Sequence, residues 1–146
     1  MDAHVDAPPA VVERAIELDL TTEELWAAVC DPASWLSDEG SLTISPGGEG
    51  TLVDEGIVRR AVVEEVEAGR RLVFRWWRDG GDRSDESRVE LTIAAMPATS
   101  VLTVRETRPA VARASAAAPA PSAVRWEVRL TCLGLLFAVA PALARV

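Results

Sequence analysis

The sequence predicts an α+β fold in which a curved antiparallel β-sheet carries helices near the two ends of the chain. Three observations support this prediction. An alternating segment at residues 11–20 leads directly into a capped helix. From Ser41 onward, apolar and polar residues alternate with a period of two in short runs separated by turn residues. A nearly continuous apolar stretch follows at residues 130–144. A sheet of this kind with a helix packed on it usually encloses a pocket.

The first strand is predicted at residues 11–20. Val12, Arg14, Ile16 and Leu18 share one side of this segment because strand side chains alternate between the two faces. The strand should therefore present one mostly apolar face to the core.

Two short helices are predicted after this strand. Thr21 and Glu24 have the spacing of a capping box, in which each side chain accepts a hydrogen bond from the backbone amide of the other residue. Asp31 and Pro32 are suited to the N-cap and first position of the second helix. That helix would direct Trp35 inward.

The rest of the sheet is predicted from alternation and from turn residues. Pro46, Gly47 and Gly48 indicate a turn in which glycine supplies a positive φ angle. Gly69 and residues 79–82 mark further reversals. Because no helical segment separates consecutive strands, they should pair as an antiparallel meander. The main predicted strands are residues 50–53, 57–66, 71–77, 86–95 and 100–107.

One domain, residues 11–146, is predicted after a flexible N-terminal tail at residues 1–10. A chain of 146 residues buries roughly 70% of its unfolded surface, which is enough for a sizeable core. Residues 109–123 are rich in alanine and proline and predict an extended linker. The closing helix is predicted at residues 124–144, with its end around Pro141.

The apolar stretch at residues 130–144 is too short to be a membrane anchor. A membrane span needs about 20 residues, whereas these 15 are flanked by Arg129 and Arg145 and interrupted by Pro141. The N-terminal residues are acidic, unlike the basic start of a signal peptide. We therefore expect no membrane partner and a cytoplasmic location.

Charge and cysteine content exclude further classes of protein. The net charge of −8 and the isoelectric point near 4.7 would repel a phosphate backbone, so no nucleic-acid partner is expected. Cys30 and Cys132 lie far apart among apolar residues and are interpreted as small buried hydrophobes rather than a disulfide or a zinc site.

The residue types present restrict the possible chemistry. His4 is the only histidine and lies in the N-terminal tail, so no catalytic triad or histidine-based zinc site is expected. The chain has no lysine, tyrosine, asparagine or glutamine. The acidic residues between positions 79 and 86 lack the spacing of an EF-hand loop. We expect neither a metal nor a cofactor.

Strand alternation predicts which side chains face the inside of the curved sheet. Glu106 has the parity of Leu102 and Val104, so it should lie at the end of an otherwise apolar face. A desolvated carboxylate there would pair with an arginine or have a raised pKa. The alternatives are a strand-end glutamate that reaches solvent and a structural ion pair. The predicted ligand-binding residues are Trp35, Phe74, Trp76, Val89, Leu91, Leu102, Val104, Glu106, Trp126 and Leu130.

The aromatic residues in this set have two possible roles. Aromatic side chains line ligand cavities, but simple core packing uses the same residues and is the commoner case. Trp77 is predicted on the opposite face of the sheet, where it would be exposed or form an interface.

Taken in order, these segments resemble a known family. The chain is similar to the activator-of-heat-shock-protein-90-ATPase-like branch of the START-like (SRPBCC) superfamily over residues 11–108. The resemblance implies a helix-grip fold, in which a bent antiparallel sheet wraps around a long C-terminal helix with a cavity between them. It also implies a bacterial protein, since family members are typically ligand carriers, bacterial proteins of unassigned role, or occasionally cyclase-like enzymes. The linker at residues 109–123 is longer than is usual in the family. The segments that carry the resemblance are residues 21–26, Trp35, and residues 46–48, 70–76, 87–91 and 102–106.

Three functions are consistent with these expectations. The first is non-catalytic binding of a small hydrophobic or aromatic molecule between the sheet and the last helix. The second is a cyclase-like or hydrolase-like enzyme with Glu106 as general base and an arginine that stabilises an oxyanion. The third is a co-chaperone-like interaction domain that uses the outer face near Trp77 or an open sheet edge, with a homodimer or another protein as partner.

Overall fold

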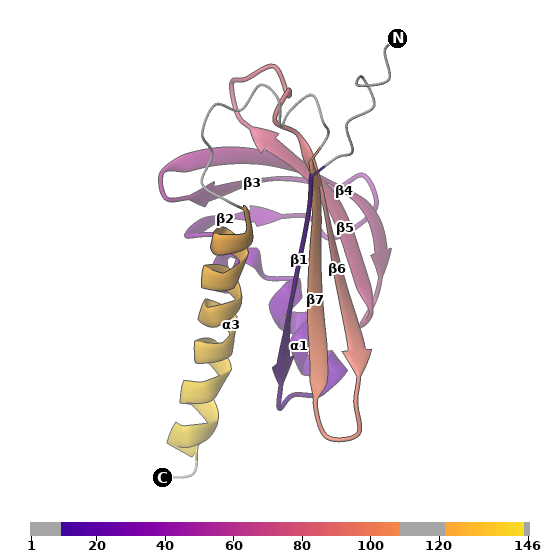
Figure 1. Ribbon diagram of the computed structural model, residues 1–146, viewed down its shortest axis with the longest axis vertical. Helices are drawn as coiled ribbons and strands as arrows, with labels where there is room; N and C mark the ends of the chain where they lie inside the picture. The colour runs from indigo at the N-terminus through magenta and orange to yellow at the C-terminus, as the bar shows by residue number, and fades with distance from the viewer. Residues whose placement is uncertain (1–9, 109–121, 145–146) are drawn as a thin grey trace.

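The computed structural model describes residues 10–108 and 122–144, so the predicted tail and most of the predicted linker lie outside the described residues. Within these residues, seven strands form one antiparallel sheet in the order β1-β7-β6-β5-β4-β3-β2 (Figure 1). Strands β2 to β7 follow one another as the predicted meander, and β1 pairs with β7. The strands are β1 (Ala10–Leu18), β2 (Glu39–Leu42), β3 (Glu49–Asp54), β4 (Ile57–Glu67), β5 (Arg71–Arg78), β6 (Ser87–Ala95) and β7 (Ser100–Arg108).

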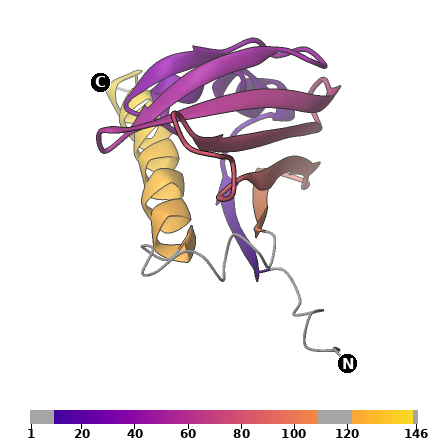
Figure 2. The same cartoon turned by 90° about the horizontal axis from the view of Figure 1, so that it is seen from above.

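The sheet bends in its β2–β4 half. The turn between β2 and β3 contains Gly47, whose φ angle of 82° is the positive value predicted for this turn. This turn lies on β4, because Gly47 N donates to Val63 O at 2.9 Å and Val63 N donates to Gly48 O at 2.8 Å. Next to this contact, the pairing of β4 with β5 shifts between Val63 and Glu65. Such a bulge bends and twists a strand. Figures 1 and 2 show β2 to β4 curving over toward helix α3 (Ser122–Ala144).

Helix α1 (Thr22–Val29) begins with the predicted capping box. Glu24 N donates to Thr21 Oγ1 at 3.1 Å, and Thr21 N donates to Glu24 Oε1 at 2.9 Å. The second predicted helix is only a short 3₁₀ turn, η2 (Pro32–Ser34). Asp31 makes no side-chain capping bond, so this turn lacks the contact that favours a longer helix. The segment is anchored instead by Trp35 Nε1, which donates to Ala28 O at 3.0 Å.

Helix α3 lies beside β1 (Figure 1). It begins at Ser122 rather than at residue 124, because Ala123 is a strong helix former and the last residues of the predicted linker join the helix. It also continues past Pro141, where an end was predicted, to Ala144. A proline removes one backbone hydrogen bond and its ring crowds the preceding turn, but Pro141 lies in the last turn, where little of the helix follows it. In the part of the chain that is described, no helix combines the length and the apolar character needed to cross a membrane.

The core lies between the concave face of the sheet and helices α1 and α3. Residues of one parity on each central strand are buried, as predicted. Val73 differs, because alternation places it on the outer face and yet it is fully buried. Its cross-strand neighbours Glu65 and Glu90 both pair with Arg71, at 2.6 Å and 2.9 Å. We attribute the burial of Val73 to these charged side chains, which bridge the strands around it.

Candidate functional site

The ten predicted ligand-binding residues lie together in the interior. Each side chain is no more than 5% exposed, so they form closely packed core. Trp126 of α3 stacks on Trp76 with 5.9 Å between ring centroids, and Trp35 lies 6.5 Å from Trp126. Phe74 meets Trp76 edge to face at 5.5 Å. Four aromatic rings, from β5, α3 and the residue after η2, therefore form one continuous cluster.

The buried carboxylate of Glu106 lies at one end of this aromatic cluster. It faces Val12 of β1 and Val89 of β6 across the sheet and is 2% exposed. Its Oε1 accepts a hydrogen bond from Trp126 Nε1 at 2.9 Å. Its Oε2 accepts from Trp76 Nε1 at 3.0 Å and from Ser87 Oγ at 2.5 Å. One carboxylate thus joins β5, β6, β7 and α3.

The environment of Glu106 decides its charge. Burial by itself would raise the pKa of this carboxyl group, as the sequence suggested. The hydrogen bonds from Ser87, Trp76 and Trp126, together with the nearby charge of Arg125, outweigh burial and leave the pKa below its ordinary value. A raised pKa, one of the alternatives expected for this carboxylate, is therefore not found, and Glu106 is ionised at neutral pH.

Arg59 on β4 is a site residue that sequence reasoning missed. It is 8% exposed, and its Cζ lies 4.9 Å from the centroid of the Trp76 ring. Burial lowers its pKa, and the positive charge of Arg125 lowers it further. The alternation of β4 indicates that Arg59 is buried, since it has the parity of the buried residues Ala61 and Val63.

A second charged group fixes α3 to the sheet. Arg129 of α3 pairs with Asp54 at the end of β3 and, at 3.1 Å, with Asp38. Asp38 also accepts a hydrogen bond from Glu55 N at 2.8 Å. These contacts lower the pKa of Asp38, whereas the two carboxylates raise the pKa of Arg129 despite its desolvation. Arg125 lies 3.7 Å from Asp54, one turn earlier on the same helix.

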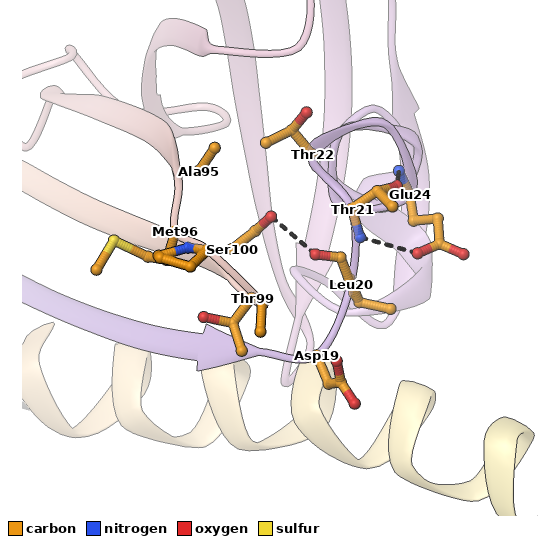
Figure 3. A pocket seen from close by; sticks show the side chains of 11 residues that line it. Asp19, Leu20, Thr21, Thr22, Glu24, Ala95, Met96, Thr99 and Ser100 are labelled. Carbon is orange, nitrogen blue, oxygen red and sulfur yellow. Dashed lines mark hydrogen bonds between the residues drawn. The ribbon is translucent and has the colours of Figure 1, made fainter.

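A hollow of about 320 Å³ lies at the other end of the sheet, between the start of α1 and the turn that joins β6 to β7 (Figure 3). None of the predicted site residues lines it. Its polar atoms already serve the fold, since Ser100 Oγ donates to Leu20 O at 2.8 Å and the Thr21–Glu24 capping box forms one wall. Within the described residues, no group of three acidic, histidine or cysteine side chains gathers to hold a metal ion.

Several solved structures share this fold. MLL2253 from Mesorhizobium loti matches with a TM-score of 0.75 and 19% identity, covering 88% of this chain and 96% of that one. CalU16 from Micromonospora echinospora matches with a TM-score of 0.65 and 22% identity, covering 94% and 88%. DynU16, from the dynemicin biosynthetic locus, matches with a TM-score of 0.71 and 23% identity. That match covers 89% of this chain but only 48% of DynU16, so the chain spans about half the length of that protein. At these identities the likeness shows the fold alone.

The family itself follows from a comparison of sequences. No functionally curated protein matches the chain. The profile of the family described as activator of Hsp90 ATPase homolog 1-like protein matches residues 19–133. This range begins directly after β1, extends into α3 and includes Glu106, Arg59 and the tryptophan cluster. The chain therefore belongs to the activator of Hsp90 ATPase homolog 1-like family, within the START-like superfamily.

Proposed function

We propose that this protein binds a small apolar or aromatic molecule between the concave face of the sheet and helix α3, without transforming it. The observation that carries the proposal is the chemistry of the interior, where four aromatic rings contact one another next to one hydrogen-bonded carboxylate. Ligand sites are mostly apolar and aromatic, with a few fixed polar groups that orient the ligand. The ten predicted residues supply both parts of such a site.

A ligand would enter by moving α3 relative to the sheet. Helix α3 supplies Trp126, Leu130 and Leu133 to the interior. It is held through side chains, chiefly the pairs of Arg129 and the hydrogen bond from Trp126 to Glu106. A small displacement of the helix would therefore open the stack of Trp126 on Trp76 without breaking the sheet. The aromatic ring of a ligand would take the place of one partner in that stack.

The state of Glu106 favours binding over catalysis. A general base needs a free oxygen within reach of the substrate and a pKa close to the working pH. Both oxygens of Glu106 already accept hydrogen bonds, and the pKa of the group is lowered. We therefore assign this carboxylate to holding the interior together rather than to proton abstraction.

The outer face near Trp77 offers little free apolar surface to a protein partner. Arg83 covers the Trp77 ring, with its Cζ 3.7 Å from the ring centroid. Arg83 also pairs with Glu86 at 2.8 Å, and Glu86 pairs with Arg75 at 3.2 Å. This ring is therefore already occupied by a cation of its own chain, which favours the interior as the binding site.

Titration with N-phenyl-1-naphthylamine tests the proposal, because this neutral aromatic fluoresces in apolar surroundings. We expect saturable binding to the wild type and binding weakened by about tenfold or more in Val104→Trp, which fills the interior. Val101→Trp adds the same side chain to the opposite face of β7 and should bind like the wild type. Native mass spectrometry of freshly purified protein would check for a molecule acquired in the cell.

Circular dichroism must show that Val104→Trp is folded. If it is not, Ala61→Val makes a smaller addition to the same buried face. Absence of saturable binding to the wild type, or equal binding to the filled and the control variants, would contradict the proposal.

A further inference from the structure

Arg59 is a buried cation on the inner face of β4. It lies opposite Leu52 of β3, and its parity is that of Ala61 and Val63. Its guanidinium lies over the ring of Trp76, which attracts a cation but supplies no anion and no hydrogen-bond acceptor in the ring plane. The charge is therefore placed inside the apolar core beside the aromatic cluster.

The other buried charges of the interior have partners, whereas Arg59 lacks one. Glu106 accepts three hydrogen bonds, and Asp54 pairs with Arg129. Among the described residues, Arg59 Nε has no hydrogen-bond acceptor. The ion pairs found there, including those of Asp54, do not involve Arg59. A buried donor without a partner is costly, and a buried charge without one is more costly still. Such a group in a native protein calls for a specific explanation.

A second guanidinium increases the need for an anion here. Arg125 of α3 is close enough to lower the pKa of Arg59 by repulsion. Glu106, Asp85 and Asp54 act in the opposite direction but only partly offset burial and that repulsion, since the pKa of Arg59 stays below its ordinary value. An anionic group beside Arg59 Nε would satisfy the free donor and offset the repulsion between the two cations.

We infer that the interior site takes an aromatic molecule that carries an anionic group, a carboxylate or sulfonate, which pairs with Arg59. This inference rests on the proposed function, because it names the class of molecule that the same site would bind. The ring of the ligand would lie against Trp76, and its anion would accept a hydrogen bond from Arg59 Nε. Glu106 keeps its hydrogen bonds from Trp76 and Ser87 and repels a misplaced anion, so it sets the orientation of the ligand.

A matched pair of probes tests this inference. The probe 8-anilinonaphthalene-1-sulfonate is N-phenyl-1-naphthylamine with one added sulfonate group. We expect the wild type to bind the sulfonated probe more tightly than the neutral one. In Arg59→Met this preference should fall by about tenfold or more, while binding of the neutral probe changes little. Arg60→Met is the matched control, since Arg60 is the next residue on β4, points outward and is exposed.

The two possible failures are distinguishable. If neither probe binds saturably to the wild type, the proposed function fails. If the neutral probe binds but the preference for the sulfonate is absent, or is the same in Arg59→Met and the wild type, the assignment to Arg59 is overturned and the binding site stands.

Stability separates a ligand-binding role of Arg59 from a structural one. A buried charge without a partner carries a desolvation cost that an apolar side chain of similar length does not. Arg59→Met should therefore unfold at the same urea concentration as the wild type or at a higher one. A clear decrease in the midpoint, together with an unchanged probe preference, would show that Arg59 serves only the fold.

Discussion

Glu106 remains charged in the core because its hydrogen bonds more than offset the cost of burial. Strand alternation predicted its inward direction correctly, since it shares parity with Leu102 and Val104. The identity of its donors was not predictable, because Trp76, Ser87 and Trp126 come from three other elements. The same donors decide its pKa, so the sequence alone could not choose between a raised pKa and a charge stabilised by a partner.

Glu106→Gln should lower the free energy of unfolding by about 2 kcal/mol, because hydrogen bonds to a buried carboxylate are replaced by weaker neutral ones and one amide donor faces other donors. Urea unfolding at neutral pH measures the effect. Glu13→Gln on the exposed side of β1 is the control and should change stability by no more than about 0.5 kcal/mol. Equal stability of the two variants would show that the three hydrogen bonds contribute nothing net.

The comparison of the wild type with Glu106→Gln also predicts how the stability difference changes with pH. The pKa of Glu106 is lower in the folded protein than in the unfolded chain, so its contribution is fully present above the unfolded value of about 4.3. That contribution is lost as the pH falls through the folded pKa. The stability gap between the wild type and Glu106→Gln should therefore narrow in acid. Asp38 and Glu64, whose pKa values are also lowered, are common to both proteins and cancel in the difference. A gap that widens in acid would contradict this assignment.

The burial of Arg59 could not be predicted from its residue type. An arginine in an alternating strand is normally assigned to solvent, because arginine is rarely buried without a partner. Its parity is that of Ala61 and Val63 on the buried face of β4, but the charge of an arginine favours the solvent-exposed face. Only the three-dimensional arrangement shows that β4 carries this cation beneath α3 and against Trp76.

At the scale of elements, the strands, the start of α1 and the ends of α3 were predictable to within a few residues, whereas the second short helix was not. The segment predicted at 57–66 is observed as Ile57–Glu67, and that predicted at 71–77 as Arg71–Arg78. Alternation is continuous along a strand, so it defines these limits well. Helices depend on caps and local contacts, and η2, whose N-cap Asp31 makes no capping bond, is only three residues long.

The docking of α3 depends more on the buried ion pair between Arg129 and Asp54 than on the exposed pair between Arg14 and Glu127. Arg129→Ala leaves Asp54 buried without its principal cation and should destabilise the protein by about 3 kcal/mol. Urea unfolding measures this change, and hydrogen exchange should show the largest increase in α3. The control is Arg14→Ala, which breaks a 3.1 Å pair with Glu127 of the same helix whose side chains are 40% and 60% exposed. That pair should contribute less than about 1 kcal/mol. Similar losses in both variants would refute the central role of Arg129.

For the whole molecule, the curved antiparallel sheet with a C-terminal helix is confirmed, and with it the family. The arrangement of the interior was harder to predict. Period-two patterns identify which faces are buried, but they do not say whether Trp126 of α3 stacks on Trp76 or leaves room beside it. That depends on where the last helix comes to rest, and residues 109–121, which precede it, lie outside the described part of the chain.

The pairing of β1 with β7 has a consequence for how the chain folds. Ala10 lies opposite Arg108, so β1 pairs with the strand of the described sheet that lies furthest from it in the sequence. Contacts between such distant segments form slowly, because a long loop must close first. Strands β2 to β7 pair with their neighbours in the sequence, so their hairpins close only short loops. In pulse-labelled refolding, the amides of β1 should therefore gain protection after those of β4 and β5. Until that time β7 has an open strand edge, which is exposed to pairing with other chains.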